Sequence, residues 1–272
     1  MAGRGTENTL LDTVATGKSA ESTGPLSSAG KVLALLDAFG VSRAVLGVSE
    51  LATRAQLSKS TAHRLLGVLV ERDYVQRIDD RYCLTDRMFV LGNQVRICRP
   101  NGLRERAVPF MTELFAETRE TVHLAVLHGT EVLYLEKIFG HGAAPCSTTV
   151  GTRRPVHCTA LGKALVAFAD EATVHANLTT GLQRFTRYTL VYPKQLQAAL
   201  ARVHQEGVAT DLEEYKLGVT CIAAPVREPA TGQAVAALSI SSVTSRGDVR
   251  RHKSRIIRAA EALSDHLAMT SY

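Results

Sequence analysis

The stretch SKSTAHRLLGVLVERDYVQR, residues 58–77, decides the fold of the first third of the chain. It opens with hydroxyl and basic side chains, becomes apolar and ends charged. Ser58 has the side chain of a helix N-cap. Four apolar residues follow at the i, i+3, i+4, i+7 spacing of one helix face: Ala62, Leu65, Leu66 and Leu69. The stretch therefore predicts a helix with a buried apolar face and a polar N-terminal end.

Two shorter helical patterns precede this helix. Residues 32–39 carry an apolar stripe, and Ser49 is expected to cap a helix of barely two turns. Two short helices joined by a tight connection at Gln56-Leu57 form a helix-turn-helix, whose second helix enters the major groove of DNA N-terminus first. There, hydroxyls and cations reach base edges and phosphates. The residues expected to contact DNA are Ser58, Lys59, Ser60, Thr61, His63 and Arg64.

A short hairpin is predicted directly after this motif. Two strand-like runs, Tyr74–Ile78 and Arg81–Leu84, flank Asp79-Asp80. The hairpin has the size of the wing of a winged helix, with Arg77 and Arg81 placed to contact backbone phosphates. A single amphipathic helix with a solvated polar face would explain residues 58–71 alone. Three helices at this spacing followed by a hairpin favour DNA binding.

The remaining sequence suggests three further segments. Residues 1–27 contain no apolar core of a signal peptide and are interpreted as a flexible tail that precedes the winged helix-turn-helix of residues 28–85. Residues 86–102 are expected to form a linker helix that breaks at Pro100-Asn101-Gly102. Residues 103–268 alternate helical and hairpin-spaced strand patterns, which predicts an α+β domain with a largely antiparallel sheet.

Composition bounds the class of protein. The 272 residues are 45% apolar, enough for real cores, yet no window approaches the length of an uncharged membrane span. Five cysteines without a C-x-x-C pair favour reduced thiols in a cytoplasmic protein. The net charge of +6 permits a polyanionic partner but is too small to demonstrate one.

Three long segments of the second domain, together with the winged helix, resemble the IclR family of bacterial transcription regulators. They are GTRRPVHCTALGKALVAF (151–168), TDLEEYKLGVTCIAAPV (210–226) and AVAALSIS (234–241), and the resemblance covers roughly residues 28–268. It implies an effector-binding domain similar to GAF or PAS domains, assembly as dimers or dimers of dimers, and palindromic or nearly palindromic operators. It also implies a small organic ligand that changes occupancy of the DNA.

Three parts of this domain are expected to form the ligand pocket. Thr159 can cap the helix that follows, which exposes the amides of Ala160 and Leu161 to a carboxylate. The second part is the strand pair that carries Asp211 and Cys221. The third is Ser239 and Ser241, which share one strand face by period-2 alternation. The resemblance implies that keto-acid-binding members use the positions of Ala160, Leu161, Asp211, Cys221, Ser239 and Ser241. Val126, Leu133 and Ser147 are further candidates for the walls.

Asp211 constrains the ligand. A carboxylate repels an anionic ligand unless one of them is protonated or a hydroxyl lies between them, which favours a hydroxy acid, a phenol or an amide. A role as a strand-end turn residue is the alternative for Asp211, and backbone-bonded strand hydroxyls are the alternative for the serines.

Other classes of function have weaker support. Six residues suggest zinc by their types, but lack local ligand spacing: His123, His128, His141, Cys146, His157 and Cys158. Cys158 beside His157 and the S-x-x-K of residues 28–31 are no evidence of catalysis, because catalytic partners meet in space. We therefore expect no enzyme and no cofactor, with zinc as the alternative. A ligand-responsive repressor is the prediction, and an activator of a catabolic operon or a ligandless architectural DNA binder remains open.

Overall fold

The computed structural model describes residues 26–40, 45–99, 101–141, 144, 146 and 148–269. The chain divides into two units between Val95 and Arg96, inside the segment predicted as a linker. Nearly all of the predicted tail lies outside the described residues. Its last residue, Ser27, is the N-cap of the first helix, since its Oγ accepts a hydrogen bond from Gly30 N at 3.1 Å.

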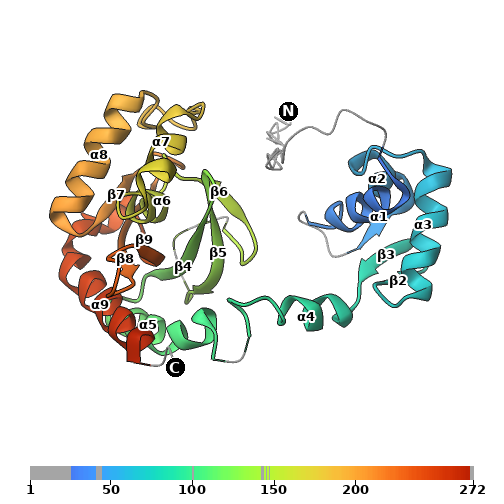
Figure 1. Ribbon diagram of the computed structural model, residues 1–272, viewed down its shortest axis with the longest axis horizontal. Helices are drawn as coiled ribbons and strands as arrows, with labels where there is room; N and C mark the ends of the chain where they lie inside the picture. Colours follow the sequence, from blue (N-terminus) through green and yellow to red (C-terminus); the bar gives the residue numbers. More distant parts are fainter. Residues whose placement is uncertain are drawn as a thin grey trace, which may run out of the picture. The chain divides into compact units, whose positions relative to one another are not determined.

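The first unit is a three-helix motif with a small sheet (Figure 1). Its elements are α1 (Ser28–Asp37), β1 (Leu46–Gly47), α2 (Val48–Arg54), α3 (Lys59–Glu71), β2 (Val75–Ile78) and β3 (Arg81–Leu84). The strands are antiparallel in the order β1-β3-β2. The apolar faces of α1, α2 and α3 meet in one core around Leu35, Leu51 and Leu66, which are completely buried. This is the winged helix-turn-helix that the sequence predicts.

Two helix boundaries differ from the prediction. Helix α2 begins at Val48, because the extended Gly47 occupies the N-cap position and Ser49 is already helical. Helix α4 (Asp86–Gly92) ends seven residues before Arg99, so the linker helix is shorter than the one expected to reach the break at Pro100-Asn101-Gly102. After Gly92 and Asn93, residues with weak helix propensity, the backbone bonds of Gln94 and Val95 close tight i→i+3 turns instead.

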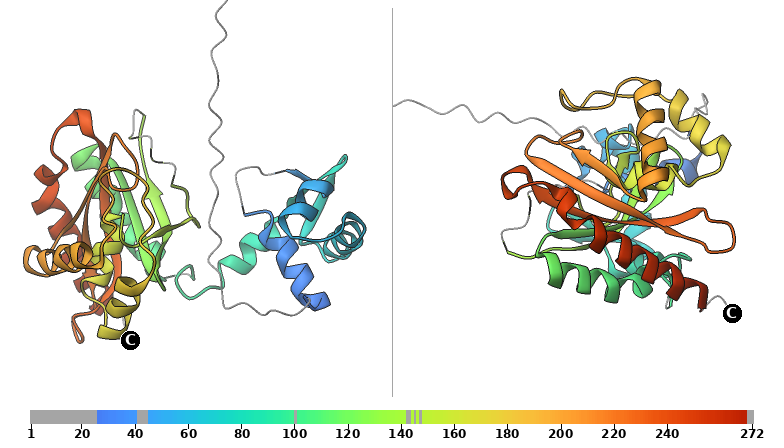
Figure 2. Two further views of the ribbon diagram at one scale, coloured as in Figure 1. Left: turned by 90° about the horizontal axis from the view of Figure 1, so that it is seen from above. Right: turned by 90° about the vertical axis from the view of Figure 1, so that its left-hand side faces the viewer.

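The second unit is a six-stranded antiparallel sheet with helices on both faces (Figure 2). Its strands, in the order β6-β5-β4-β9-β8-β7, are β4 (Thr121–His128), β5 (Glu131–Ile138), β6 (Arg153–Pro155), β7 (Ala209–Leu212), β8 (Val219–Arg227) and β9 (Ala234–Val243). Its helices are α5 (Leu103–Thr118), α6 (Ala160–Val166), α7 (Glu171–Thr179), α8 (Pro193–Glu206) and α9 (Lys253–Met269), with short 3-10 turns η1 (Thr244–Arg246) and η2 (Val249–His252).

Strand alternation gives this sheet two different faces. Leu238 and Ile240 point to the face covered by α5 and α9, where they are completely buried in an apolar core. The intervening Ser239 and Ser241 point to the opposite face, where α6 and α8 pack on small residues such as Ala223 and Ala237. Small side chains and hydroxyls on that second face leave room for a cavity. No helix among the described residues is long and apolar enough to cross a membrane.

Candidate functional site: a polar helix face and a buried cavity

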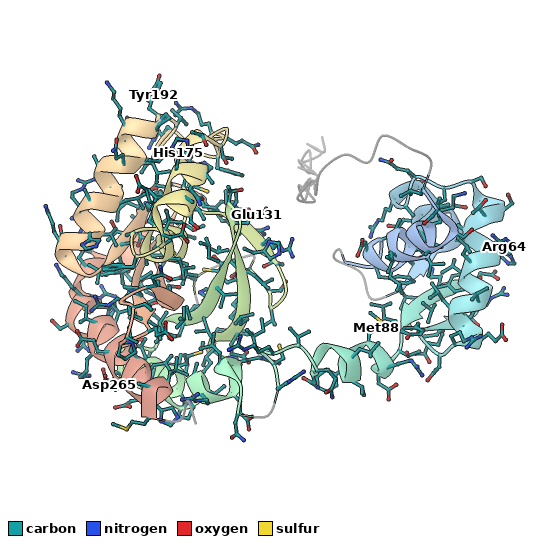
Figure 3. All side chains as sticks on the ribbon, viewed as in Figure 1. Arg64, Met88, Glu131, His175, Tyr192 and Asp265 are labelled. Carbon is teal, nitrogen blue, oxygen red and sulfur yellow. The ribbon has the colours of Figure 1, made fainter. Side chains whose placement is uncertain are left out.

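The N-terminal end of α3 presents an exposed polar surface. Ser58 Oγ accepts a hydrogen bond from Thr61 N at 3.3 Å and thereby caps the helix. Lys59, Ser60, His63 and Arg64 are exposed, and Thr61 is half-buried. Figure 3 shows Arg64 on the outer side of α3. The apolar residues of the same helix are buried, so the polar face is free to meet another molecule.

The wing places its two arginines differently. Arg81 is exposed at the start of β3. Arg77 folds over the turn, where its Nε donates to Asp79 O at 2.7 Å and its guanidinium pairs with Asp80 at 2.9 Å. Asp80 is almost fully exposed, and such surface pairs contribute little free energy. Arg77 can therefore exchange this partner for a phosphate.

The second unit contains a small cavity, of about 40 Å³, on the α6 face of the sheet. All seven residues predicted to bind an effector line it: Thr159, Ala160, Leu161, Asp211, Cys221, Ser239 and Ser241. Strand pairing explains why they meet. Asp211 lies opposite Cys221, and Cys221 lies opposite Ser241, so these three side chains form a row across β7, β8 and β9.

The start of α6 forms one wall of the cavity. Thr159 Oγ1 accepts a hydrogen bond from Gly162 N at 3.1 Å, as expected of an N-cap. The amides of Ala160 and Leu161 have no backbone acceptor among the described residues. Gly162 allows the helix to approach the preceding loop, since an added Cβ would lie 2.4 Å from Val156 Cα. A larger residue would push this wall away from the sheet.

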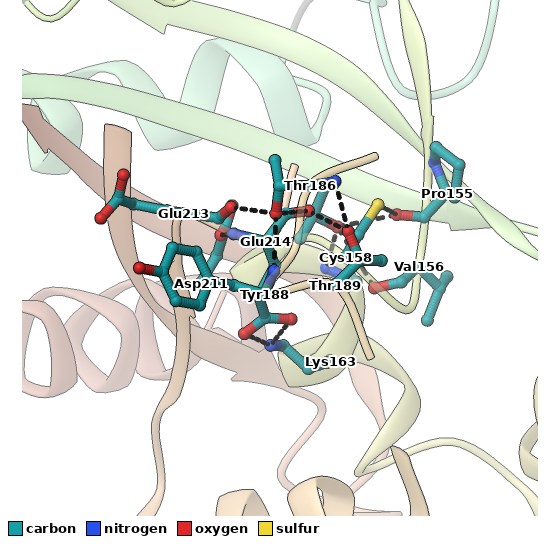
Figure 4. Close-up of polar contacts among 12 residues, drawn as sticks. Pro155, Val156, Cys158, Lys163, Thr186, Tyr188, Thr189, Asp211, Glu213 and Glu214 are labelled. Atoms are coloured by element: carbon teal, nitrogen blue, oxygen red, sulfur yellow. Dashed lines mark hydrogen bonds and ion pairs between the residues drawn. The ribbon is translucent and has the colours of Figure 1, made fainter. Parts of the chain in front are cut away.

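Asp211 is a buried acid in a network of charged and hydroxyl groups (Figure 4). Its Oδ1 accepts a hydrogen bond from Glu214 N at 2.7 Å, and Glu214 forms a two-pronged ion pair with Lys163 at 2.5 and 2.6 Å. Burial raises the pKa of Asp211 to about 7, Lys163 opposes this rise and Glu214 adds to it. Asp211 therefore stabilises the turn that follows its strand, through the bond to Glu214 N, and its carboxyl group is partly protonated near neutral pH.

The loop that carries Glu214 is held from outside. Thr186 Oγ1 donates to Glu213 O at 2.7 Å, and Thr189 Oγ1 donates to Glu214 O at 2.6 Å. The next residues of this loop, Tyr215 and Lys216, line the cavity. The loop is thus a fixed wall with an exposed lysine at its rim.

A chain of hydrogen bonds crosses the floor of the cavity. Cys221 Sγ lies 3.1 Å from Ser241 Oγ, Ser241 Oγ lies 3.5 Å from His123 Nδ1, and His123 Nε2 lies 2.8 Å from Thr148 Oγ1. Burial and the nearby charge of Lys137 lower the pKa of His123 to about 3, so the imidazole is neutral. The Ser241 hydroxyl contacts side chains rather than the backbone, which argues against the purely structural alternative for this residue.

Seven lining residues were not predicted as effector contacts: His123, Tyr134, Cys146, Thr148, Tyr215, Lys216 and Val219. Tyr215 and Lys216 follow Asp211 closely in sequence, and this proximity could have identified them as lining residues. Val126 and Leu133 were wrong as walls, because they pack against the α5–α9 core on the other sheet face. Strand alternation already places them there, because Val126 follows Ala125 of the cavity face and Leu133 lies between Val132 and Tyr134 of that face. Ser147 lies outside the described residues.

The histidines and cysteines considered for zinc do not converge. Within the described part of the chain, no three residues among His, Cys, Asp and Glu are grouped so as to hold a metal ion. His157 Nε2 instead contacts Gln183 O at 2.9 Å, and His128 Nε2 lies 3.3 Å from an Arg153 nitrogen.

Comparison with known proteins covers both units. The family model described as IclR helix-turn-helix domain matches residues 28–79, and the model described as Bacterial transcriptional regulator IclR C-terminal matches residues 96–268. The chain is 37% identical over 227 residues to HTH-type transcriptional regulator XynR of Escherichia coli, covering 82% of this chain and 88% of that protein. It is 30% identical to the transcriptional repressor IclR of the same species, covering 90% and 91% respectively.

A solved structure of similar fold contains a ligand. It is an IclR homolog from Microbacterium hydrocarbonoxydans complexed with 4-hydroxybenzoate, which matches with a TM-score of 0.82 and 29% identity. The match covers 90% of this chain and all of that one. The matched proteins are transcriptional regulators rather than enzymes, as the sequence led us to expect.

Proposed function

Because this chain belongs to the IclR family of bacterial transcriptional regulators, we propose that it binds a palindromic operator and changes its DNA affinity when a small organic acid occupies the cavity. The observation that supports this most is the convergence of seven predicted residues on one cavity, in a unit separate from the winged helix. The effector shifts the population of DNA-binding-competent molecules.

In this proposal α3 reads the DNA. Ser58, Ser60 and Thr61 bring hydroxyls, and Lys59, His63 and Arg64 bring cationic or amphoteric groups, to the end of the helix that enters the major groove. Arg77 and Arg81 of the wing contact flanking phosphates.

The effector is a small carboxylic acid that also carries a hydrogen-bond donor. The amides of Ala160 and Leu161 and the hydroxyl of Ser241 suit an acidic group, and Asp211 suits a hydroxyl or phenol. Support comes from the relative bound to 4-hydroxybenzoate, a molecule that carries both groups.

Two copies or more are needed for a palindrome, and we infer a homodimer or a dimer of dimers. The exposed apolar side chains of Phe89, Val90, Leu91 and Val95 in and after α4 support self-association, because monomers rarely leave such clusters open. Repression is the proposed sign of action, in keeping with the relative named a transcriptional repressor. Operator DNA lies in the bacterial cytoplasm, which is the proposed location.

The test is a titration of the purified protein against a fluorescent fragment of its own upstream region at two salt concentrations, followed by candidate hydroxylated and aromatic acids. We expect tight, salt-sensitive binding that one of the acids alters. Salt-sensitive binding that no acid changes would contradict the effector role and favour a ligandless DNA binder. No binding at either salt concentration would contradict the proposal that this protein is a DNA-binding regulator.

A matched pair of variants locates the DNA contact. Arg64→Ala is expected to weaken operator binding and leave effector affinity unchanged, whereas Lys194→Ala, an exposed residue of α8, is expected to leave both unchanged. Unaltered operator binding by the Arg64 variant would show that α3 has been assigned the wrong role.

A further inference from the structure

We propose that Lys137 and Arg154 form a cationic wall on the β5–β6 side of the cavity, which selects an acid over its neutral amide and turns the acidic group toward that side. This inference rests on the proposed function, because it concerns recognition in the same effector cavity. Neither residue is among those that the sequence analysis singled out.

Lys137 stands beside the cavity on β5. It lies directly opposite His123 in the β4–β5 pairing, and His123 lines the cavity, so both side chains are on that face. Lys137 Nζ donates to the carbonyl oxygens of Cys146 at 3.1 Å and Thr148 at 2.8 Å, two further lining residues. Its charge is felt at His123, whose pKa it helps to lower.

The charge of Lys137 has no carboxylate partner among the described residues. The nearest acid in sequence, Glu136, belongs to an ion pair with Arg104 at 2.9 Å. The two carbonyls use two of the three ammonium hydrogens, and the Phe139 ring centroid lies 5.0 Å from Nζ, but none of these groups carries a negative charge.

Arg154 stands behind Tyr215. It pairs in register with Val132, which is buried in the α6–α8 core, and this places Arg154 on the cavity face of the sheet. Its guanidinium carbon lies 5.2 Å from the centroid of the Tyr215 ring, and Tyr215 lines the cavity. One of its terminal nitrogens donates to Arg153 O at 3.1 Å, whereas its Nε is buried without a hydrogen-bond partner, and no described carboxylate pairs with the guanidinium. A buried, unpaired donor of a cation is stabilised by an anion nearby.

The opposite side of the cavity contains the buried carboxyl group of Asp211, with Lys216 exposed at its rim. Asp211 lies on β7, and β8, β9 and β4 separate that strand from β5. Glu214 beside it is neutralised by Lys163, so Asp211 is the acid that remains. Positive charge without a described carboxylate partner therefore lies next to the cavity on the β5–β6 side, and on the β7 side the buried lining group is the carboxyl of Asp211. An acid with a hydroxyl at its far end matches this arrangement.

The experiment is calorimetry with matched acids and amides. The pairs are 4-hydroxybenzoate with 4-hydroxybenzamide, pyruvate with pyruvamide, and glycolate with glycolamide. For the pair that binds, we expect wild type to hold the acid about tenfold or more tightly than the amide, and Lys137→Gln/Arg154→Gln to reduce this ratio to about threefold or less. Lys137→Arg/Arg154→Lys keeps both charges and is expected to keep the ratio, as is the distant Lys194→Gln.

Orientation is tested with the same protein. The affinity ratio of 4-hydroxybenzoate to benzoate is expected to be equal in wild type and in the double variant, because the phenol is on the Asp211 side. If the double variant does not fold, Arg154→Gln alone is measured with the same pairs and is expected to reduce the acid-to-amide ratio by about threefold.

Each outcome bears on a different claim. If Lys137 and Arg154 only held the loop and the Tyr215 ring in place, their replacement would lower the affinities for acid and amide by the same factor. An unchanged acid-to-amide ratio in the double variant therefore overturns the cationic wall. A wild-type ratio near one overturns it as well while leaving the effector site intact. Failure of every acid and amide to bind wild type contradicts the proposed function itself.

Discussion

Replacing Asp211 with Asn tests the electrostatics of the cavity without a ligand. The side chain is 4% exposed, and burial is the largest cause that raises its pKa from 3.8 to about 7. A difference of about 3 pKa units corresponds to about 4 kcal/mol in the free energy of unfolding. Asn keeps an oxygen that can accept the Glu214 amide but cannot ionise.

The direction of the effect follows from proton binding. The folded protein holds the Asp211 proton more tightly than the unfolded chain, so its contribution to stability is complete below the unfolded pKa of 3.8 and is lost as pH rises toward 7. Between pH 5 and pH 8, wild type is expected to lose about 2.5 kcal/mol more stability than Asp211→Asn. All other titrating groups are shared by the two proteins and cancel in the comparison.

The assay is urea unfolding of the second unit at pH 5, 6, 7 and 8, followed by circular dichroism. Glu261→Gln, a neutralised carboxylate on an exposed position of α9, is the matched control and is expected to follow wild type in parallel. Parallel curves for Asp211→Asn and wild type would refute the reasoning, because they would mean that Asp211 ionises with an ordinary pKa in the folded protein.

Three further substitutions test packing and capping by urea or thermal unfolding. Ser58→Ala removes the N-cap of α3 and should cost the first unit about 1 kcal/mol, unlike Ser254→Ala in α9; an unchanged midpoint would refute the cap. Lys163→Met strands a buried Glu214 and should cost about 3–5 kcal/mol, most of it recovered by adding Glu214→Leu; no recovery would contradict the ion-pair account. Gly162→Ala forces a backbone clash at Val156 and should destabilise the second unit, whereas Gly67→Ala, with open space around it, should not; equal midpoints would refute the close approach.

The first unit could be predicted almost completely from the sequence. Its helices depend on local signals, namely the apolar spacing of Leu65, Leu66 and Leu69 and the cap at Ser58, and the structure reproduces both. The differences from the prediction occur at helix ends: Gly47 is the N-cap of α2, and α4 ends at Gly92. Local signals suffice there because a helix closes its hydrogen bonds within a few residues.

The cavity divides into a predictable and an unpredictable part. Thr159, Asp211, Cys221 and Ser241 were identified on motif and alternation, which act along one strand or one helix start. His123, Tyr134 and Thr148 enter the cavity only because β4 pairs with β9, more than a hundred residues away, and with β5 on its other edge. Val126 and Leu133 were assigned as walls without a strand-face argument, and alternation along β4 and β5 places both on the α5–α9 face.

Sequence alone determined which residues prefer helix, strand and cap, and therefore the type of each unit. Tertiary structure alone decided which charges are left without partners. Glu214 and Asp211 are both acids in one short run, yet Lys163 from α6 neutralises the first and burial protonates part of the second. Lys137 and Arg154 are ordinary strand cations in the sequence, and only the sheet sets them beside a cavity without a counter-charge. The reason is physical: helix propensity acts over neighbouring residues, whereas the free energy of a charge depends on every group that surrounds it in space.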